Sequence, residues 1–127
     1  MAHVKELSTK ILLDALAYTT TTTGSAVDLQ GLASPGVRGM RATVSCGIAT
    51  GTSASVTIKI QESDTTTSAD FSDISGATFT ALTTTTASSE SIYFRTNKRY
   101  VRAVATYTSN TTSASLAVWT TGELRQS

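Results

Sequence analysis

The feature that most constrains the fold is an alternation of apolar and polar residues with a period of two. It begins near Val37 and continues almost to the end of the chain. In the segment 40–48, every second residue is apolar: Met40, Ala42, Val44, Cys46 and Ile48. Successive side chains of a β-strand point to opposite faces, so this pattern predicts a strand with one buried and one solvated face. Segments 56–61, 99–107 and 114–119 alternate in the same way, and the chain is therefore predicted to be all-β.

Turn signals between these segments suggest how they connect. The stretch 49–53 contains Gly51 and lies between two alternating segments, which predicts a β-hairpin. Segment 62–72 is polar and without periodicity, so it is predicted to be a long surface loop. Segment 71–76 is predicted to be a compact turn, and 77–82 a short strand containing Phe79. Val27–Asp28 begins a further predicted strand that runs to residue 32.

The first third of the chain leaves two possibilities open. Leu7, Ile11, Leu12 and Leu16 are spaced either for a short helix or for an extended arm or strand, and the threonines that follow favour the extended form. The predicted organisation is an N-terminal arm over 1–18, extended or partly helical, and one domain over 19–127. The number of short strands points to a single antiparallel β-sandwich, immunoglobulin-like or jelly-roll.

Composition excludes several classes of protein. The single cysteine allows no internal disulfide, and the net charge of +1 offers no dense basic face for nucleic acid. The cluster Arg95, Lys98, Arg99 and Arg102 is predicted to be the solvated edge of a hairpin. No stretch approaches the roughly 20 apolar residues of a membrane helix, and residues 1–7 do not match a secretory signal. We therefore expect no nucleic-acid partner and no membrane partner.

The residues needed for catalysis are sparse. With one histidine, His3, and one cysteine, Cys46, the chain cannot assemble a zinc set, and no nucleophile elbow or phosphate loop is present. We therefore predict no enzyme activity, no cofactor and no metal. One alternative is calcium, or a pair of acids for glycoside hydrolysis, in the loop that carries these carboxylates: Glu62, Asp64, Asp70 and Asp73. Asp73 is more simply explained as a residue that caps turn backbone.

Four short segments resemble small structural proteins of tailed bacteriophages, of the kind encoded near the major capsid protein. They are 47–52 (GIATGT), 56–64 (VTIKIQESD), 71–76 (FSDISG) and 99–102 (RYVR), and the resemblance extends over 27–118. It implies a virion protein, and a capsid decoration or cement protein first among these. Such a protein is made in the host cytoplasm, binds the major capsid protein and forms an oligomer, with a trimer favoured.

On that reading the N-terminal segment and several large side chains form interfaces. The predicted interface residues are Val4, Leu7, Ile11, Leu12, Leu16, Tyr18, Tyr100, Arg102 and Trp119. Two other readings stay open. The first alternative is another virion part, such as a tail, connector or fibre component, because one fold serves many functions. A carbohydrate-binding module is the alternative outside that class, with these aromatic residues as candidates: Tyr93, Tyr100, Tyr107 and Trp119.

Overall fold

A computed structural model of the chain describes residues 7–18, 21–29, 38–47, 49–52, 54–83, 88–108 and 111–123. Within these ranges the chain forms strands and one short 3-10 helix. The elements are β1 (Leu7–Tyr18), β2 (Thr22–Thr23), β3 (Val27–Asp28), β4 (Arg38–Cys46), β5 (Thr50–Gly51), β6 (Ser55–Ser63), η1 (Ser68–Asp70), β7 (Ser72–Thr78), β8 (Leu82–Thr83), β9 (Ser88–Thr96), β10 (Tyr100–Tyr107) and β11 (Thr111–Glu123). No helix in this part of the chain is long and apolar enough to cross a membrane.

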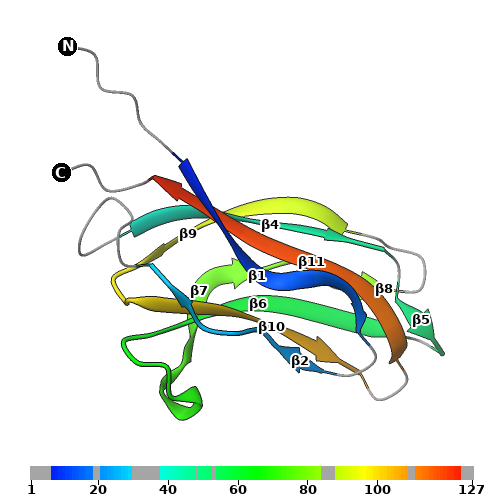
Figure 1. Cartoon of the computed structure of the whole chain (residues 1–127). Helices are drawn as coiled ribbons and strands as arrows, with labels where there is room; N and C mark the ends of the chain where they lie inside the picture. Colours follow the sequence, from blue (N-terminus) through cyan, green and yellow to red (C-terminus); the bar gives the residue numbers. More distant parts are fainter. Residues whose placement is uncertain are drawn as a thin grey trace.

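The strands form two sheets that pack face to face (Figure 1). Sheet A has the strand order β1-β11-β4-β9, and β5 also pairs with β11. Sheet B has the order β2-β10-β6-β7, with β3 paired to β10 and β8 paired to β6. Every pair is antiparallel. The predicted all-β antiparallel sandwich is therefore confirmed.

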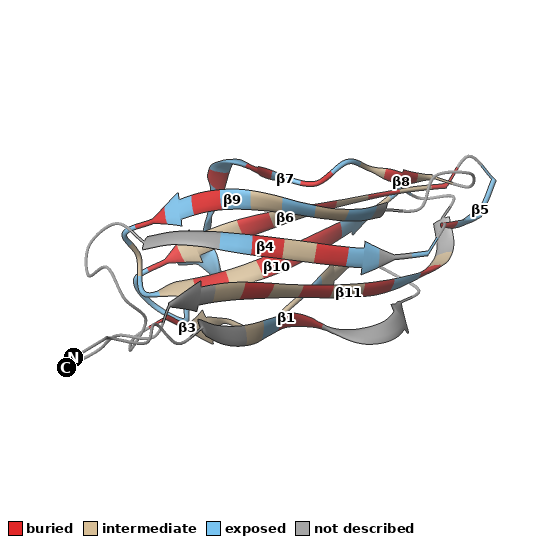
Figure 2. Ribbon diagram, turned by 90° about the horizontal axis from the view of Figure 1, so that it is seen from above, coloured by how far each residue is buried: buried red, intermediate tan, exposed pale blue. Residues whose placement is uncertain are grey.

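The core lies between the sheets and is made by the apolar side of each alternating segment. Along β4, β9 and β11, buried residues alternate with more exposed ones (Figure 2). The inward-facing residues include Ala42, Val44, Val56, Ile58, Ile60, Val101, Ala103, Ala105, Ala114, Leu116 and Val118. The predicted faces of these strands are confirmed, because a period of two dictates which side chains share a face.

The N-terminal segment is a strand of the sandwich. β1 pairs with β11 from Leu7, opposite Glu123, to Tyr18, opposite Ala114, and so the extended form is the one observed. Leu12 and Leu13 are both buried. Neighbouring residues of one strand reach the core together because the β1–β11 register shifts at this point. Residues 7–18 thus belong to sheet A rather than to an arm outside the domain, and the predicted division at residue 18 does not separate two structural units.

Gly24 brings the two sheets together along β1. Its amide donates a hydrogen bond to the carbonyl of Ala103 in sheet B, at 2.8 Å. On its other side, a Cβ at this position would lie only 2.1 Å from the carbonyl oxygen of Leu12 in β1. Glycine is therefore needed here for the close approach of two backbones.

The predicted hairpins are wrong. β4 lies in sheet A and β6 in sheet B, so the glycine-containing stretch after β4 connects the two sheets. β9 and β10 are likewise in different sheets, and the turn that contains Lys98 crosses the end of the sandwich rather than forming the edge of a hairpin. Two alternating strands can bury their apolar faces either as neighbours in one sheet or by facing each other across the core. The alternation of apolar and polar residues therefore does not predict which strands pair.

The stretch 62–78 also differs from its prediction. β6 continues to Ser63, and Ser72–Thr78 is a strand, β7, that pairs with β6, instead of a turn. Only Ile74 and Ala77 are buried along β7, a spacing of three. The alternation is interrupted by the register shift between β6 and β7 and by Gly76, whose φ of 80° is left-handed. The strand therefore has no period-two pattern by which the sequence could predict it. Phe79, predicted within a strand, follows β7 and is buried.

Candidate functional site

The outer face of sheet A carries the large exposed hydrophobic side chains of the described residues, Ile11 and Tyr93. Trp119 lies in β11 between two fully buried residues, Val118 and Thr120, so its side chain points away from the core. The register places Ile11 of β1 on one side of Trp119 and Thr43 of β4 on the other. Ile11 is 55% exposed, whereas Trp119 is half-buried. An apolar row of Ile11 and Trp119 therefore lies across β1 and β11 on the outside of the sheet, with Thr43 of β4 at its end.

A cation–aromatic pair lies next to this row. Arg41 of β4 is paired in register with Tyr93 of β9, and Tyr93 is 73% exposed. The Arg41 guanidinium carbon lies 4.9 Å from the centroid of the Tyr93 ring, and Arg41 Nη2 donates a hydrogen bond to the Tyr93 hydroxyl. Both contacts hold the two side chains together on an exposed surface. We call the surface formed by Ile11, Trp119, Thr43, Arg41 and Tyr93 the aromatic face.

The rest of this surface consists of small polar residues and one more arginine. Thr43 and Ser91 share a hydrogen bond of 2.9 Å between their hydroxyls. Arg95 follows Tyr93 on the same side of β9 and is exposed. Among the outward-facing residues of sheet A whose side chains are described, the charged ones are Arg41 and Arg95, both positive. This composition, aromatic and arginine-containing, is typical of the energetically important parts of protein interfaces.

The outer face of sheet B is different, because its charged groups bind one another. Arg102 donates to the Gln61 side-chain oxygen at 2.9 Å and to the Ser68 hydroxyl at 3.0 Å. Its guanidinium also lies 4.1 Å from the Phe71 ring centroid. Gln61 in turn donates to Asp73 at 2.8 Å. The network attaches the segment around η1 to sheet B.

Two carboxylates of sheet B, Asp73 and Asp28, accept hydrogen bonds from neighbouring side chains. Hydrogen bonds from Gln61 and Lys59 lower the pKa of Asp73 below 3.8, its ordinary value. Asp28 accepts two bonds from Arg99, from Nε at 3.0 Å and from Nη2 at 2.8 Å. The hydrogen bond to Asp28 raises the pKa of Arg99. These pairs are largely exposed, so each contributes little net stability.

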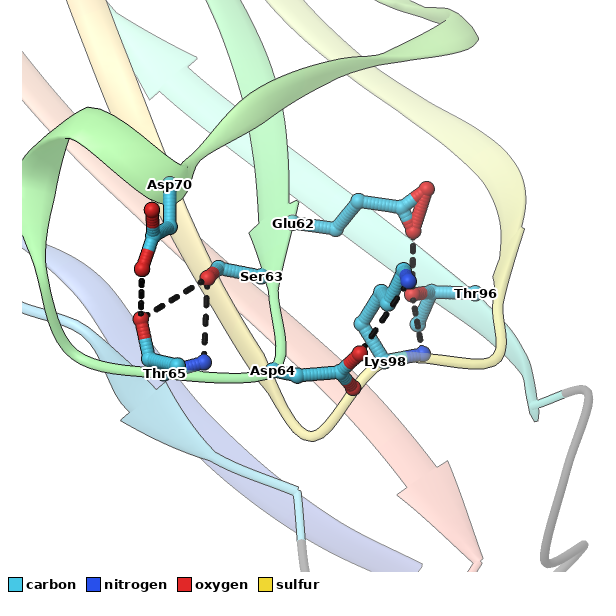
Figure 3. Close-up of polar contacts among 7 residues, drawn as sticks. All are labelled: Glu62, Ser63, Asp64, Thr65, Asp70, Thr96 and Lys98. Atoms are coloured by element: carbon cyan, nitrogen blue, oxygen red, sulfur yellow. Dashed lines mark hydrogen bonds and ion pairs between the residues drawn. The ribbon is translucent and has the colours of Figure 1, made fainter.

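The carboxylates considered for calcium are engaged with protein donors (Figure 3). Glu62 accepts from the buried Thr96 hydroxyl at 2.6 Å, Asp64 pairs with Lys98 at 3.1 Å, and Asp70 accepts from the Thr65 hydroxyl at 2.7 Å. Among the described residues, no group of three or more histidine, cysteine, aspartate or glutamate side chains is arranged to hold a metal. The arrangement serves to fix the loop after β6 against the turn after β9.

The predicted interface residues fall into separate parts of the molecule. The structure brings Ile11 and Trp119 together on sheet A, while Tyr100 and Arg102 lie on the opposite, outer face of sheet B. Leu12 is part of the core. Three others lie in β1, where the structure describes the backbone only: Leu7, Leu16 and Tyr18. Val4 lies outside the described residues.

Arg41 and Thr43 were missed as members of a candidate site. Both occupy the polar side of an alternating strand, and the pattern alone predicts only a solvated face there. A signal was present, since arginine is the one long side chain on that side of 40–48. That Arg41 lies near Tyr93 and Trp119 depends on the order of the strands in the sheet, which a local sequence pattern does not reveal.

Comparison with known proteins bears on the fold. No protein-family model matches the sequence, and no curated protein sequence matches it either. Among solved structures, the chain is similar to the crystal structure of the SPBc2 prophage-derived protein YomS, with a TM-score of 0.53 and 12% sequence identity over 97% of each chain. At this identity the likeness establishes a shared fold, and it covers the whole sandwich.

Proposed function

We propose that this chain is a non-enzymatic structural protein of a phage virion, which binds the outer capsid lattice and stabilises the head. The observation that carries the proposal is the aromatic face of sheet A. An exposed tyrosine stacked with an arginine, beside a tryptophan and an exposed isoleucine, is suited to binding another protein through contact area.

The phage setting is supported by two independent likenesses. The first is the fold shared over 97% of both chains with a prophage-derived protein. The second is the resemblance of segments 56–64 and 71–76 to small phage structural proteins, and the structure places these segments together in the pair β6–β7. On this proposal the protein is made in the host cytoplasm and ends in the virion.

The partners in this proposal are the major capsid protein and further copies of the chain, with a trimer favoured. A lattice offers many equivalent sites, so linked copies bind with an avidity far above that of one contact. The affinity of each single contact can then be modest, as expected for a small surface such as the aromatic face.

A carbohydrate-binding module is the second candidate, because Trp119 and Tyr93 both lie on the outer face of sheet A. The polar neighbours favour it less. The Arg41 guanidinium covers one face of the ring on which a sugar would stack, and the Thr43 and Ser91 hydroxyls already share a hydrogen bond.

The decisive experiment is the copy number of this protein in purified particles, measured against the major capsid protein by quantitative mass spectrometry. Hundreds of copies, in a simple ratio to the lattice, are expected for a decoration protein. A dozen or fewer would assign it to the tail or connector instead. Absence from particles, together with binding in a glycan screen, would replace the proposal by the carbohydrate-binding one.

A further inference from the structure

We infer that the aromatic face docks an acidic protein surface, in which a carboxylate binds Arg41 and apolar groups cover Trp119 and Ile11. The inference rests on the proposed function and extends it, because it assigns both the face that meets the particle and the chemistry of the partner surface. It is carried by the charges of sheet A and by the contrast with sheet B.

The basic residues of sheet B already have anionic or polar acceptors within the chain. Arg99 pairs with Asp28 at 2.8 Å, Lys98 with Asp64 at 3.1 Å and Lys59 with Asp73 at 3.0 Å. Arg41 differs, since within the described part of the chain its hydrogen bond goes to the neutral hydroxyl of Tyr93. A guanidinium has five donors in a planar fork, so Arg41 keeps donors for a carboxylate.

The stacking on Tyr93 prepares Arg41 for such a partner. It restricts the long side chain to one region of the surface, which lowers the entropy that binding would otherwise remove. The apolar row of Ile11 and Trp119 lies two residue pairs away along the strands, because Arg41 is opposite Thr121 and Trp119 is opposite Thr43. A partner that excludes water from this row would also strengthen the charged hydrogen bond beside it.

Two other occupants fit the face less well. A second copy, packed through the outer face of sheet A, would place the Arg41 and Arg95 side chains of both copies in one interface, and like charges across an interface are unfavourable. A nucleic acid would need many cations along a track, whereas the outer face of sheet A shows two arginines, Arg41 and Arg95, among its described side chains. An acidic protein surface can both pair a carboxylate with Arg41 and cover Trp119 and Ile11 with apolar groups.

The test is binding to particles purified from phage that lack the gene for this protein. Purified protein is added at increasing concentration, and the bound fraction is measured after sedimentation at two salt concentrations. The variants are Arg41→Glu, Arg41→Gln and Tyr93→Ala. The control is Thr106→Glu, which adds a negative charge at an exposed position of β10 on the outer face of sheet B. Thermal unfolding of each variant checks that it is folded.

We expect Arg41→Glu to weaken binding about tenfold or more, Arg41→Gln and Tyr93→Ala to weaken it less, and Thr106→Glu to bind as the wild type does. Added salt should weaken the wild type more than Arg41→Gln. If the wild type binds the particles and folded Arg41→Glu binds them equally well, the inference is overturned and the proposed function stands. If the wild type itself does not bind, the proposed function fails and the inference with it. Displacement of the wild type by a single-stranded oligonucleotide would overturn the inference in favour of a nucleic-acid partner.

Discussion

Replacing Gly24 by alanine should destabilise the sandwich more than any other glycine substitution considered below. The added methyl would lie 2.1 Å from the Leu12 carbonyl oxygen and 3.3 Å from that of Ala103. Real Cβ atoms essentially never approach another heavy atom closer than 3.0 Å, so the backbone of β1 must move away by about 1 Å. That movement would loosen Leu12, which is buried in the core.

The expected cost is about 2–3 kcal/mol in the free energy of unfolding, the usual range for overpacking between elements that cannot yield. The reduced freedom of the unfolded alanine chain offsets part of it, by about 0.4–1 kcal/mol. Against a total stability of about 5–15 kcal/mol, the loss is easily measured.

Two other glycines provide matched controls. A Cβ on Gly47 meets nothing within 4 Å, so Gly47→Ala should leave stability nearly unchanged. Gly76 has the same open space but a φ of +80°, so Gly76→Ala should cost about 1–2 kcal/mol through backbone strain alone. The predicted order of destabilisation is therefore Gly24, then Gly76, then Gly47.

Urea unfolding followed by tryptophan fluorescence measures all three variants. Trp119 is the single tryptophan and is half-buried beside β1, so its emission should report loss of the β1–β11 pairing. If Gly24→Ala unfolds within about 0.5 kcal/mol of Gly47→Ala, the close approach of Leu12 to Gly24 is wrong. The placement of β1 next to Gly24 and sheet B would then be wrong as well.

Further predictions concern single contacts. The buried Thr120 hydroxyl donates to the Arg41 carbonyl at 3.0 Å, so Thr120→Val should cost about 1 kcal/mol in urea unfolding, and an unchanged midpoint would contradict the bond. Leu116→Ala should cost about 2–5 kcal/mol by leaving a core cavity, whereas the exposed Ser115→Ala should cost almost nothing. The folded pKa of Asp73 is depressed, so its stabilisation is present above pH 3.8 and is lost as the pH falls through the folded value. Asp73→Asn should therefore lower stability at neutral pH by less than about 1 kcal/mol, with the two proteins converging in acid, and a constant difference would refute the assignment.

Alternation in the amino-acid sequence predicts which residues of the regular strands face the core. Ile58, Ile60 and Val101 were predicted inward and are buried. Alternation is a local property of an extended chain, so it can be read without knowing any partner strand. It fails where the register breaks, as at Gly76 in β7, because a bulge resets which side chains point inward.

Strand pairing, and therefore which outward-facing residues become neighbours, depends on how the whole chain folds. β4 and β6 follow one another in the chain but face each other across the core, and β1 pairs with the last strand, β11. Ile11 and Trp119 could be proposed singly from the sequence as interface residues. Their position beside Arg41 and Tyr93 follows from the strand order β1-β11-β4-β9, which brings together residues from both ends and the middle of the chain. Such pairing depends on how two apolar faces cover one another, and a one-dimensional pattern does not contain that choice.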